Sequence, residues 1–183
     1  MRSLCATVTI AAGLLGTAWA TTLQKLSIDA MIQQSTAIVH VKVTGSSAAF
    51  VGRDIYTYYT LQVIETLKSS STQQSSSQPT QVAIPGGVAR GLRQMVAGAP
   101  VLTNGQEYVI FLWTSKSGLT QIIGLSQGLF VVTQDSNGNP VLARAASTGL
   151  MLNQSGQPVT DLPVTMSLGA LKTEIQTVLG SSN

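Results

Sequence analysis

Hydrophobic and polar residues alternate along several stretches of the chain, and this period of two predicts β-strands. In the first stretch, 37–43 (AIVHVKV), three valines fall on one face, while Ile38, His40 and Lys42 fall on the other. We therefore expect a strand that buries one face and ends at the Gly-Ser-Ser of 45–47.

The next stretch, 55–68 (IYTYYTLQVIETLK), is longer and rich in aromatic and β-branched residues, which favour strands. Because it follows the first strand across a modest loop, we expect the two to form a hairpin. Further strands are predicted at 81–84, 107–113, 119–125, 129–133 and 140–145. The nearly continuous apolar run at 107–113 is typical of a central strand, and the Asn-Gly turn within 135–139 predicts a meander.

Two other stretches have helical spacing. Residues 23–34 are predicted to form a short helix capped by Ser27. At 166–180, Ser167 is the expected N-cap of a C-terminal helix and Gly180 its expected end. The apolar residues of this second helix are Leu168, Leu171, Ile175, Val178 and Leu179. Between the last predicted strand and this helix, 147–165 is expected to be an extended surface segment.

These elements predict one mainly β domain over 21–183, since 183 residues suffice for one ordinary domain. We expect a closed or nearly closed OB-like barrel of about five to six strands, with both helices packed on it. A β-sandwich is the alternative. Ser- and Gln-rich residues 69–80 are expected to form a flexible loop within the domain, because they bury too little apolar area to offset the entropy of ordering.

Residues 1–20 have the three parts of a secretory signal peptide. Arg2 gives a positive start, an apolar stretch follows, and Ala18-Trp19-Ala20 supplies small residues before a cleavage site after Ala20. An uncleaved membrane anchor is the alternative, but the apolar run is shorter than the roughly 20 residues that span a bilayer. We therefore expect an exported protein, either secreted or periplasmic.

Export changes what the composition implies. Cleavage would remove Arg2 and Cys5, which leaves no cysteine and lowers the formal net charge from +3 to +2. The core, and not disulfides, must then hold the fold. Only 9% of the residues are charged, and so thin a positive charge is not the basic patch of a nucleic-acid-binding protein.

The order of these stretches resembles the netrin-like, or TIMP-like, module. The matching pieces are AIVHVKV, YTLQVIETLK, VAIPGG and VLTNGQEYVIFL, of which GQEYVIF at 105–111 is the closest. The chain also resembles small exported bacterial proteins of unassigned function that carry a PGG…GAP…G-x-x-Y/V-x-x-F-L run. The resemblance covers roughly 22–132 and implies an OB-type barrel. TIMPs inhibit metalloproteinases through an N-terminal cysteine, and a mature chain beginning Thr21-Thr22 has none, so that chemistry does not carry over.

One motif points to an enzyme. GLSQG at 124–128 matches the G-x-S-x-G nucleophile elbow, in which a strand precedes the serine and a helix follows it. Here a predicted strand follows Ser126, and the single histidine, His40, precedes the serine although the motif expects it afterwards. We therefore expect a bulge or turn between meander strands and no enzyme. A serine hydrolase using Ser126 is the less favoured alternative.

No metal or other cofactor is expected. A zinc site takes three or four ligands from His, Cys, Asp and Glu, and the mature chain has one histidine, no cysteine and scattered acids. His40 is instead expected to lie at the surface or half-buried.

The glycine-rich segment 86–98 is the candidate interaction loop. It lacks the G-K-[ST] ending of a phosphate-binding loop, while apolar residues beside arginine have the composition of protein interfaces. The candidate interaction residues are Arg90, Leu92, Arg93, Met95 and Val96. We expect a non-enzymatic module that binds another exported or cell-surface protein. The alternative for the segment is a mobile or bulged surface loop without a ligand.

Two further possibilities stay open. Tyr56, Tyr58 and Lys42 on one barrel face would suit an oligosaccharide or a single-stranded nucleic acid, although tyrosines in strands more often only cover a sheet. Asn153-Gln154-Ser155 is an N-glycosylation sequon, which matters only in an organism that glycosylates it.

Overall fold

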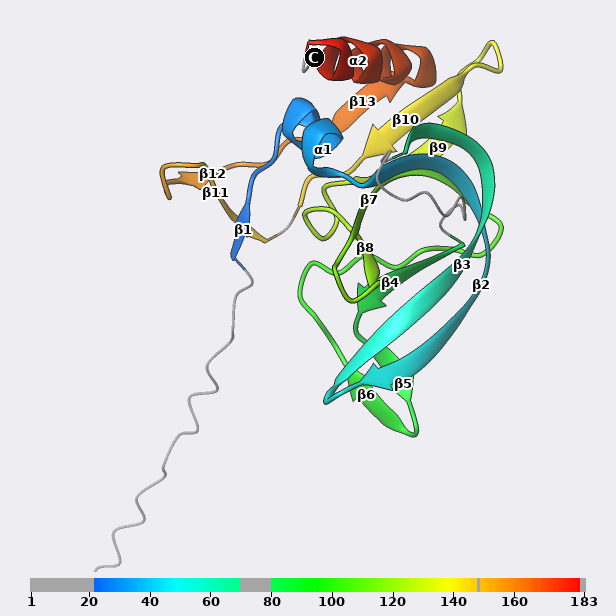
Figure 1. Cartoon of the computed structure of the whole chain (residues 1–183), viewed down its shortest axis with the longest axis vertical. Helices are drawn as coiled ribbons and strands as arrows, with labels where there is room; N and C mark the ends of the chain where they lie inside the picture. The colour runs from blue at the N-terminus through cyan, green and yellow to red at the C-terminus, as the bar shows by residue number, and fades with distance from the viewer. Residues whose placement is uncertain (1–21, 70–79, 148, 182–183) are drawn as a thin grey trace, which may run out of the picture.

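An eight-stranded antiparallel sheet organises the part of the chain that the computed structural model describes, namely residues 22–69, 80–147 and 149–181 (Figure 1). Seven of its strands lie in the order β13 (Val164–Ser167), β10 (Pro140–Arg144), β9 (Leu129–Gln134), β7 (Glu107–Thr114), β2 (Ala37–Val51), β3 (Asp54–Ser69) and β4 (Gln81–Pro85). The eighth, β8 (Thr120–Ile122), pairs with one end of β7. The prediction of a mainly β fold is confirmed.

The remaining elements are short strands and two helices. They are β1 (Thr22–Gln24), α1 (Ile28–Gln34), β5 (Gly87–Ala89), β6 (Leu92–Gln94), β11 (Leu150–Leu152), β12 (Pro158–Val159) and α2 (Leu168–Gly180). β1 pairs in parallel with β11, and β5 pairs with β6 in a separate small sheet. The predicted signal peptide at 1–20 lies outside the described residues, as does the predicted Ser/Gln loop apart from Ser69 and Thr80.

The predicted hairpin of the first two long strands is present, and it is longer than expected. β2 and β3 pair along their whole length around a turn at Gly52 and Arg53. The expected end of the first strand at 45–47 is wrong, because β2 continues through Gly45 with a register shift after Val43. Glycine and serine are weak strand formers, but the long, aromatic-rich β3 supplies cross-strand partners for them.

The central strands bury both of their faces. On β2, Ile38 and Val39 point to opposite faces, and both are 0% exposed. The prediction that this strand buries one face is therefore wrong, and His40 is buried as well. On β7, Phe111 and Ile110 divide between the two faces in the same way, which confirms the central position predicted for this apolar run.

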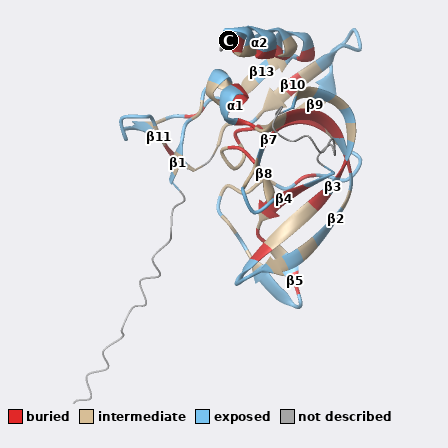
Figure 2. Cartoon of the chain, viewed as in Figure 1, coloured by how far each residue is buried: buried red, intermediate tan, exposed pale blue. Residues whose placement is uncertain are grey.

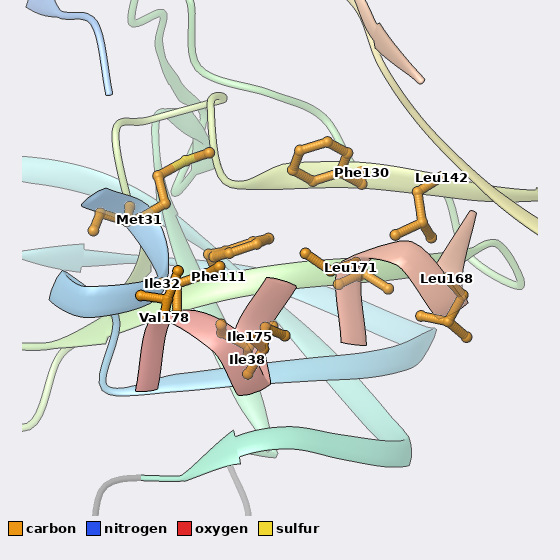
Figure 3. Packing of buried hydrophobic residues seen from close by; sticks show 12 residues of the cluster. Met31, Ile32, Ile38, Phe111, Phe130, Leu142, Leu168, Leu171, Ile175 and Val178 are labelled. Carbon is orange, nitrogen blue, oxygen red and sulfur yellow. The ribbon is translucent and has the colours of Figure 1, made fainter. Parts of the chain in front are cut away.

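Two hydrophobic cores result, one on each face of the sheet. The helix-side core lies under α1 and α2 and consists of Met31, Ile32, Ile38, Val109, Phe111, Ile123, Phe130, Leu142, Leu168, Leu171, Ile175 and Val178 (Figure 3). The inner core lies within the curve of the sheet and consists of Val39, Val41, Val43, Tyr59, Leu61, Val82, Ile84, Leu102, Tyr108, Ile110, Leu112 and Ile122. β4 lies next to β8 across this curve, yet no pairing between the described strands closes the sheet.

The N-terminal helix is shorter than predicted. Ser27 caps it as expected, accepting a hydrogen bond from the Ala30 backbone N–H at 3.1 Å, so the helix begins at Ile28. Residues 22–24 form a strand instead, because β11 offers them a partner that sequence pattern does not reveal. At the other end of α1, Lys68 Nζ donates to the carbonyls of Ile32 and Ser35 at 2.5 and 2.6 Å. A positive charge at this position stabilises the helix, because the C-terminal end of a helix carries a partial negative charge.

The C-terminal helix agrees with its prediction. Ser167 accepts a hydrogen bond from the Ala170 backbone N–H at 3.0 Å, and α2 ends at Gly180. Its four buried residues lie on the helix-side core: Leu168, Leu171, Ile175 and Val178. The two helices thus close one end of the molecule, and we call this the helix-covered end (Figure 1).

Candidate interaction surface

The predicted interaction loop is a second, smaller hairpin at the opposite end of the molecule from α2 (Figure 1). β5 and β6 pair in antiparallel register around Arg90 and Gly91, whose φ angles are both positive, at 50° and 76°. Two consecutive positive φ angles mark the tight hairpin turn that follows the natural twist of two strands. Residues 87–94 therefore form a regular β-hairpin.

This small hairpin is fixed onto β3. The Thr57 hydroxyl donates to the Gly86 carbonyl at 2.8 Å, and the Ile55 N–H donates to the Gln94 side-chain oxygen at 2.5 Å. Gly87 has a φ of 135°, and a Cβ there would overlap the Thr57 hydroxyl. Only glycine allows this close approach, so Gly87 is explained by the docking of the hairpin onto β3.

Apolar side chains gather on this part of the surface. We define the hairpin tip as residues 48–57 and 86–101, which hold the β2–β3 turn, the β5–β6 hairpin and the segment after it. Its most exposed large apolar side chains are Val88 (60%), Leu92 (61%), Met95 (80%) and Val101 (82%). Figure 2 shows the exposed colour over this end. Leu92 and Met95 were predicted here, whereas Val96 is half-buried and Val88 and Val101 were missed.

The hairpin tip is also positively charged. It contains Arg53, Arg90 and Arg93 against a single acid, Asp54, so its formal charge is +2. Arg90 lies over the Phe50 ring, with its guanidinium carbon 5.8 Å from the ring centroid, a cation–π arrangement that orders the side chain while leaving it charged. Asp54 accepts a hydrogen bond from the Gln94 amide at 3.2 Å. Within the described residues, none of the three arginines has an ion-pair partner.

A groove of about 270 Å³ runs between the small hairpin and the segment that follows it. Two inner-core residues, Tyr59 and Ile84, line it together with Pro85. Residues of the hairpin tip complete the lining: Thr57, Gly86, Gly87, Val88, Arg93, Gln94, Met95, Val96, Ala99, Pro100 and Val101. The groove is therefore apolar inside and carries one cation, Arg93.

The G-x-S-x-G motif forms a turn between β8 and β9. The Ile123 N–H donates to the Phe111 carbonyl, and the Phe111 N–H donates to the Gly128 carbonyl, so the residues between them loop out of the ladder. A strand, β9, follows directly, which confirms the predicted turn between meander strands. Ser126 lines a separate pocket near Arg144, and no described residue forms a hydrogen bond with its hydroxyl.

The same turn contains a structural residue that sequence reasoning missed. Gln127 is 1% exposed. Its side-chain oxygen accepts a hydrogen bond from the Leu26 N–H at 2.8 Å, and its amide nitrogen donates to the Gln24 carbonyl at 2.9 Å. Gln127 thus fastens the N-terminal segment to the sheet. No pattern signals this, because glutamine is ordinarily a surface residue.

His40 contacts one acidic side chain on the neighbouring strand. His40 is 8% exposed, and its Nε2 lies 3.1 Å from Glu107 Oε2 on the neighbouring strand β7. Across the described ranges, no three His, Cys, Asp or Glu side chains come together as metal ligands would. The expectation of a surface or half-buried histidine is therefore wrong, because strands on both sides of β2 and the Glu107 side chain cover His40.

The residues considered for oligosaccharides or single strands are spread along the β2–β3 hairpin. Tyr56 and Tyr58 share one side of β3, but Lys42 pairs with Gln62. Gln62 is four residues further along β3 than Tyr58, a distance of about 13 Å. The cation is thus separated from the tyrosines.

Asn153 is exposed in the turn between β11 and β12. Its side-chain oxygen accepts hydrogen bonds from the N–H groups of Ser155 and Gln157 at 3.0 and 2.9 Å. The sequon thus serves as a turn, while its side-chain nitrogen has no partner among the described residues.

A buried ion pair lies on the β10 side of the sheet. Arg144 Nη1 and Nη2 lie 2.6 and 3.0 Å from the two carboxylate oxygens of Asp161, whose side chain is 2% exposed. Hydrogen bonds from Arg144 lower the pKa of Asp161 to about 2, and the Ser147 N–H adds to this shift. This pair fixes the segment before β13 and does not face the groove at the hairpin tip.

Comparison of the chain with protein-family models, curated proteins and solved structures found no match. The helices in the described ranges are all too short or too polar to cross a bilayer. The assignment of function therefore depends on the physical character of the surface itself.

Proposed function

We propose that this protein is an exported, non-enzymatic module that binds another exported or cell-surface protein through its hairpin tip. The observation that carries the proposal is the coincidence, on a fixed hairpin, of strongly exposed apolar side chains with arginines that have no ion-pair partner in the described part of the chain. Met95 at 80% exposure and Leu92 at 61% contribute little to the stability of the isolated fold. Burial against a partner would recover about 25 cal/mol for each Å² of apolar area removed from water.

The attachment of the small hairpin to β3 favours recognition of a protein. Hydrogen bonds from Thr57 and Ile55 hold the small hairpin in place before any partner arrives. A preformed surface loses less conformational entropy on binding than a mobile loop. Arginine beside apolar side chains is also the combination enriched at the centres of protein interfaces.

The finer points of fold and location belong to the same proposal. We propose that the curved sheet is an OB-like barrel related to the netrin-like module, with its seam between β4 and β8. The N-terminal 1–20 is proposed to direct export and to be removed after Ala20. The looped-out turn around Ser126 and the His40–Glu107 contact give no support to hydrolase chemistry.

The test is recovery of partners on beads that carry the chain without residues 1–20. Extracellular and periplasmic fractions of the source organism are applied, and bound proteins are identified by mass spectrometry. In the Arg90→Glu/Arg93→Glu variant, recovery of the specific partner should fall about tenfold or more.

A matched control carries the same change of charge at two exposed lysines outside the hairpin tip, Lys42→Glu/Lys116→Glu. This control should recover the partner as the unmodified chain does. Circular dichroism should first show that both double variants are folded. Equal recovery of the partner with both variants would then mean that the hairpin tip does not bind it.

A further inference from the structure

We propose that the groove at the hairpin tip receives an extended acidic peptide segment that anchors itself with one large apolar side chain. This inference rests on the proposed function and names the chemistry of its partner. Three properties of the groove lead to it: its size, its lining and its charge.

The size of the groove suits a side chain. Its volume of about 270 Å³ falls below the range of roughly 300–1,000 Å³ in which pockets enclose most of a small-molecule ligand. A single leucine- or phenylalanine-sized group from a peptide fits such a space, while the rest of the peptide continues along the surface. The groove is therefore an anchor point for a larger chain.

The lining of the groove requires an apolar anchor. Val88, Met95 and Val101 line it while remaining 60 to 82% exposed. The inner-core residues Tyr59 and Ile84 are nearly fully covered by their own neighbours. An inserted apolar side chain would thus remove three large exposed side chains from water at once and would meet a floor that is already packed.

The charge of the groove selects acidic neighbours of that anchor. Arg93 lines the groove, and Arg53 and Arg90 belong to the same hairpin tip. The tip has a formal charge of +2, the same as the whole chain after removal of residues 1–20, so the rest of that chain is formally neutral. A carboxylate beside the anchor can form the charge-assisted hydrogen bonds that a guanidinium favours.

The shape of the surface favours a peptide over an anionic membrane. The exposed apolar side chains Val88, Met95 and Val101 line a hollow. A peptide side chain can enter this hollow, whereas a bilayer interface receives apolar groups that project from a convex face. Lipid vesicles are therefore the informative competitor in the test.

The experiment titrates short blocked peptides into ¹⁵N-labelled protein without residues 1–20. The first peptide has a central leucine flanked by glutamates, the second replaces the leucine by alanine, and the third replaces the glutamates by lysines. We expect saturable shifts of the Val88, Arg93 and Val101 amides with the first peptide. The affinity of the other two peptides should be lower by about tenfold or more.

Arg93→Glu should reverse the preference between the glutamate and lysine peptides, while Lys116→Glu should leave it unchanged. Equal binding of all three peptides, or shifts confined to other surfaces, would overturn the proposal. Binding of phosphatidylglycerol vesicles without saturable peptide binding would overturn it as well.

The two proposals fail separately. If the peptides do not bind but the Arg90→Glu/Arg93→Glu variant still loses its partner, the hairpin tip remains an interface with a different chemistry. If that variant also keeps its partner, the interface itself is wrong.

Discussion

Apolar side chains are buried at one end of the β2–β3 hairpin and exposed at the other. At the helix-covered end, α1 and α2 bury Phe111, Leu171 and Ile175 to 3% exposure or less. At the hairpin tip, neither of the two helices in the described residues covers Leu92 or Met95, and both are more than 60% exposed. The same pair of strands therefore lies beside a core closed from solvent at one end and beside an exposed apolar surface at the other (Figure 2).

This difference separates stability from recognition. Side chains in the helix-side core contribute to folding because water is excluded from them in the native state. Those at the tip gain little from folding and are available to a partner. Substitutions at the two ends should therefore affect different measurements.

The largest loss of stability is expected from Phe111→Ala. Phe111 is 0% exposed, and its ring lies 5.7 Å from that of Phe130. Its removal should lower the free energy of unfolding by about 4 kcal/mol, measured by urea denaturation. A loss below about 1 kcal/mol would mean that the helix-covered end does not hold the fold together.

Asp161→Asn should be next, at about 3 kcal/mol at neutral pH, because it leaves the buried Arg144 guanidinium without its counter-charge. The pKa of Asp161 lies near 2 in the fold and at 3.8 ordinarily. Its carboxylate therefore adds stability that is fully present above pH about 4 and is lost as the pH falls through about 2. Urea titrations between these limits should show this loss, of about 2 kcal/mol, in the unmodified chain and not in the variant.

Gly87→Ala tests how the tip is attached. The new Cβ would overlap the Thr57 hydroxyl at a φ of 135°, so we expect a loss of about 2 kcal/mol in urea denaturation. Gly91→Ala is the matched control, because its φ is also positive, at 76°, but the space around its Cβ is empty. Equal effects of the two changes would mean that strain alone, and not close docking onto β3, explains the glycine.

The smallest effect on stability is expected from Leu92→Ser/Met95→Gln. Both side chains are largely exposed, so the free energy of unfolding should change by less than about 0.5 kcal/mol. Partner recovery on beads should nevertheless fall, since the apolar surface has been removed. A large loss of stability would show that these side chains belong to the fold and would contradict the separation of the two ends.

Strong local patterns predicted much of the architecture. The apolar run around Phe111 identified the central strand, and Ser167 together with the apolar spacing that follows identified α2. These signals are reliable because a continuous apolar run, or an N-cap followed by apolar residues at helical spacing, can be read from consecutive residues. The mainly β class followed from the alternation in the other strands.

The errors arose where distant residues decide the structure. Alternation in β2 predicted one buried face, but α2, more than a hundred residues later, covers the other face at Ile38. β2 also continues beyond Gly45 because β3 is long enough to pair with it. Local propensity cannot register either effect.

At the candidate surface, the sequence predicted which residues are exposed better than it predicted the backbone that positions them. Arg90, Leu92, Arg93 and Met95 are exposed as expected. The turn at Arg90 and Gly91 was hidden, because a glycine-rich segment has little alternation to indicate strands. The contribution of Val101 depends on the fold of the segment that leads to it, so it was missed.

The topology also has a kinetic consequence for a chain that folds as it emerges from a ribosome or a translocation channel. All residues of the hairpin tip lie before position 102, so its pairings are possible before the residues of α2 are available. The cover over Phe111 requires α2, which ends at Gly180. The helix-side core therefore stays open until residues up to about Gly180 have emerged, and premature association with other chains is most to be expected during that interval.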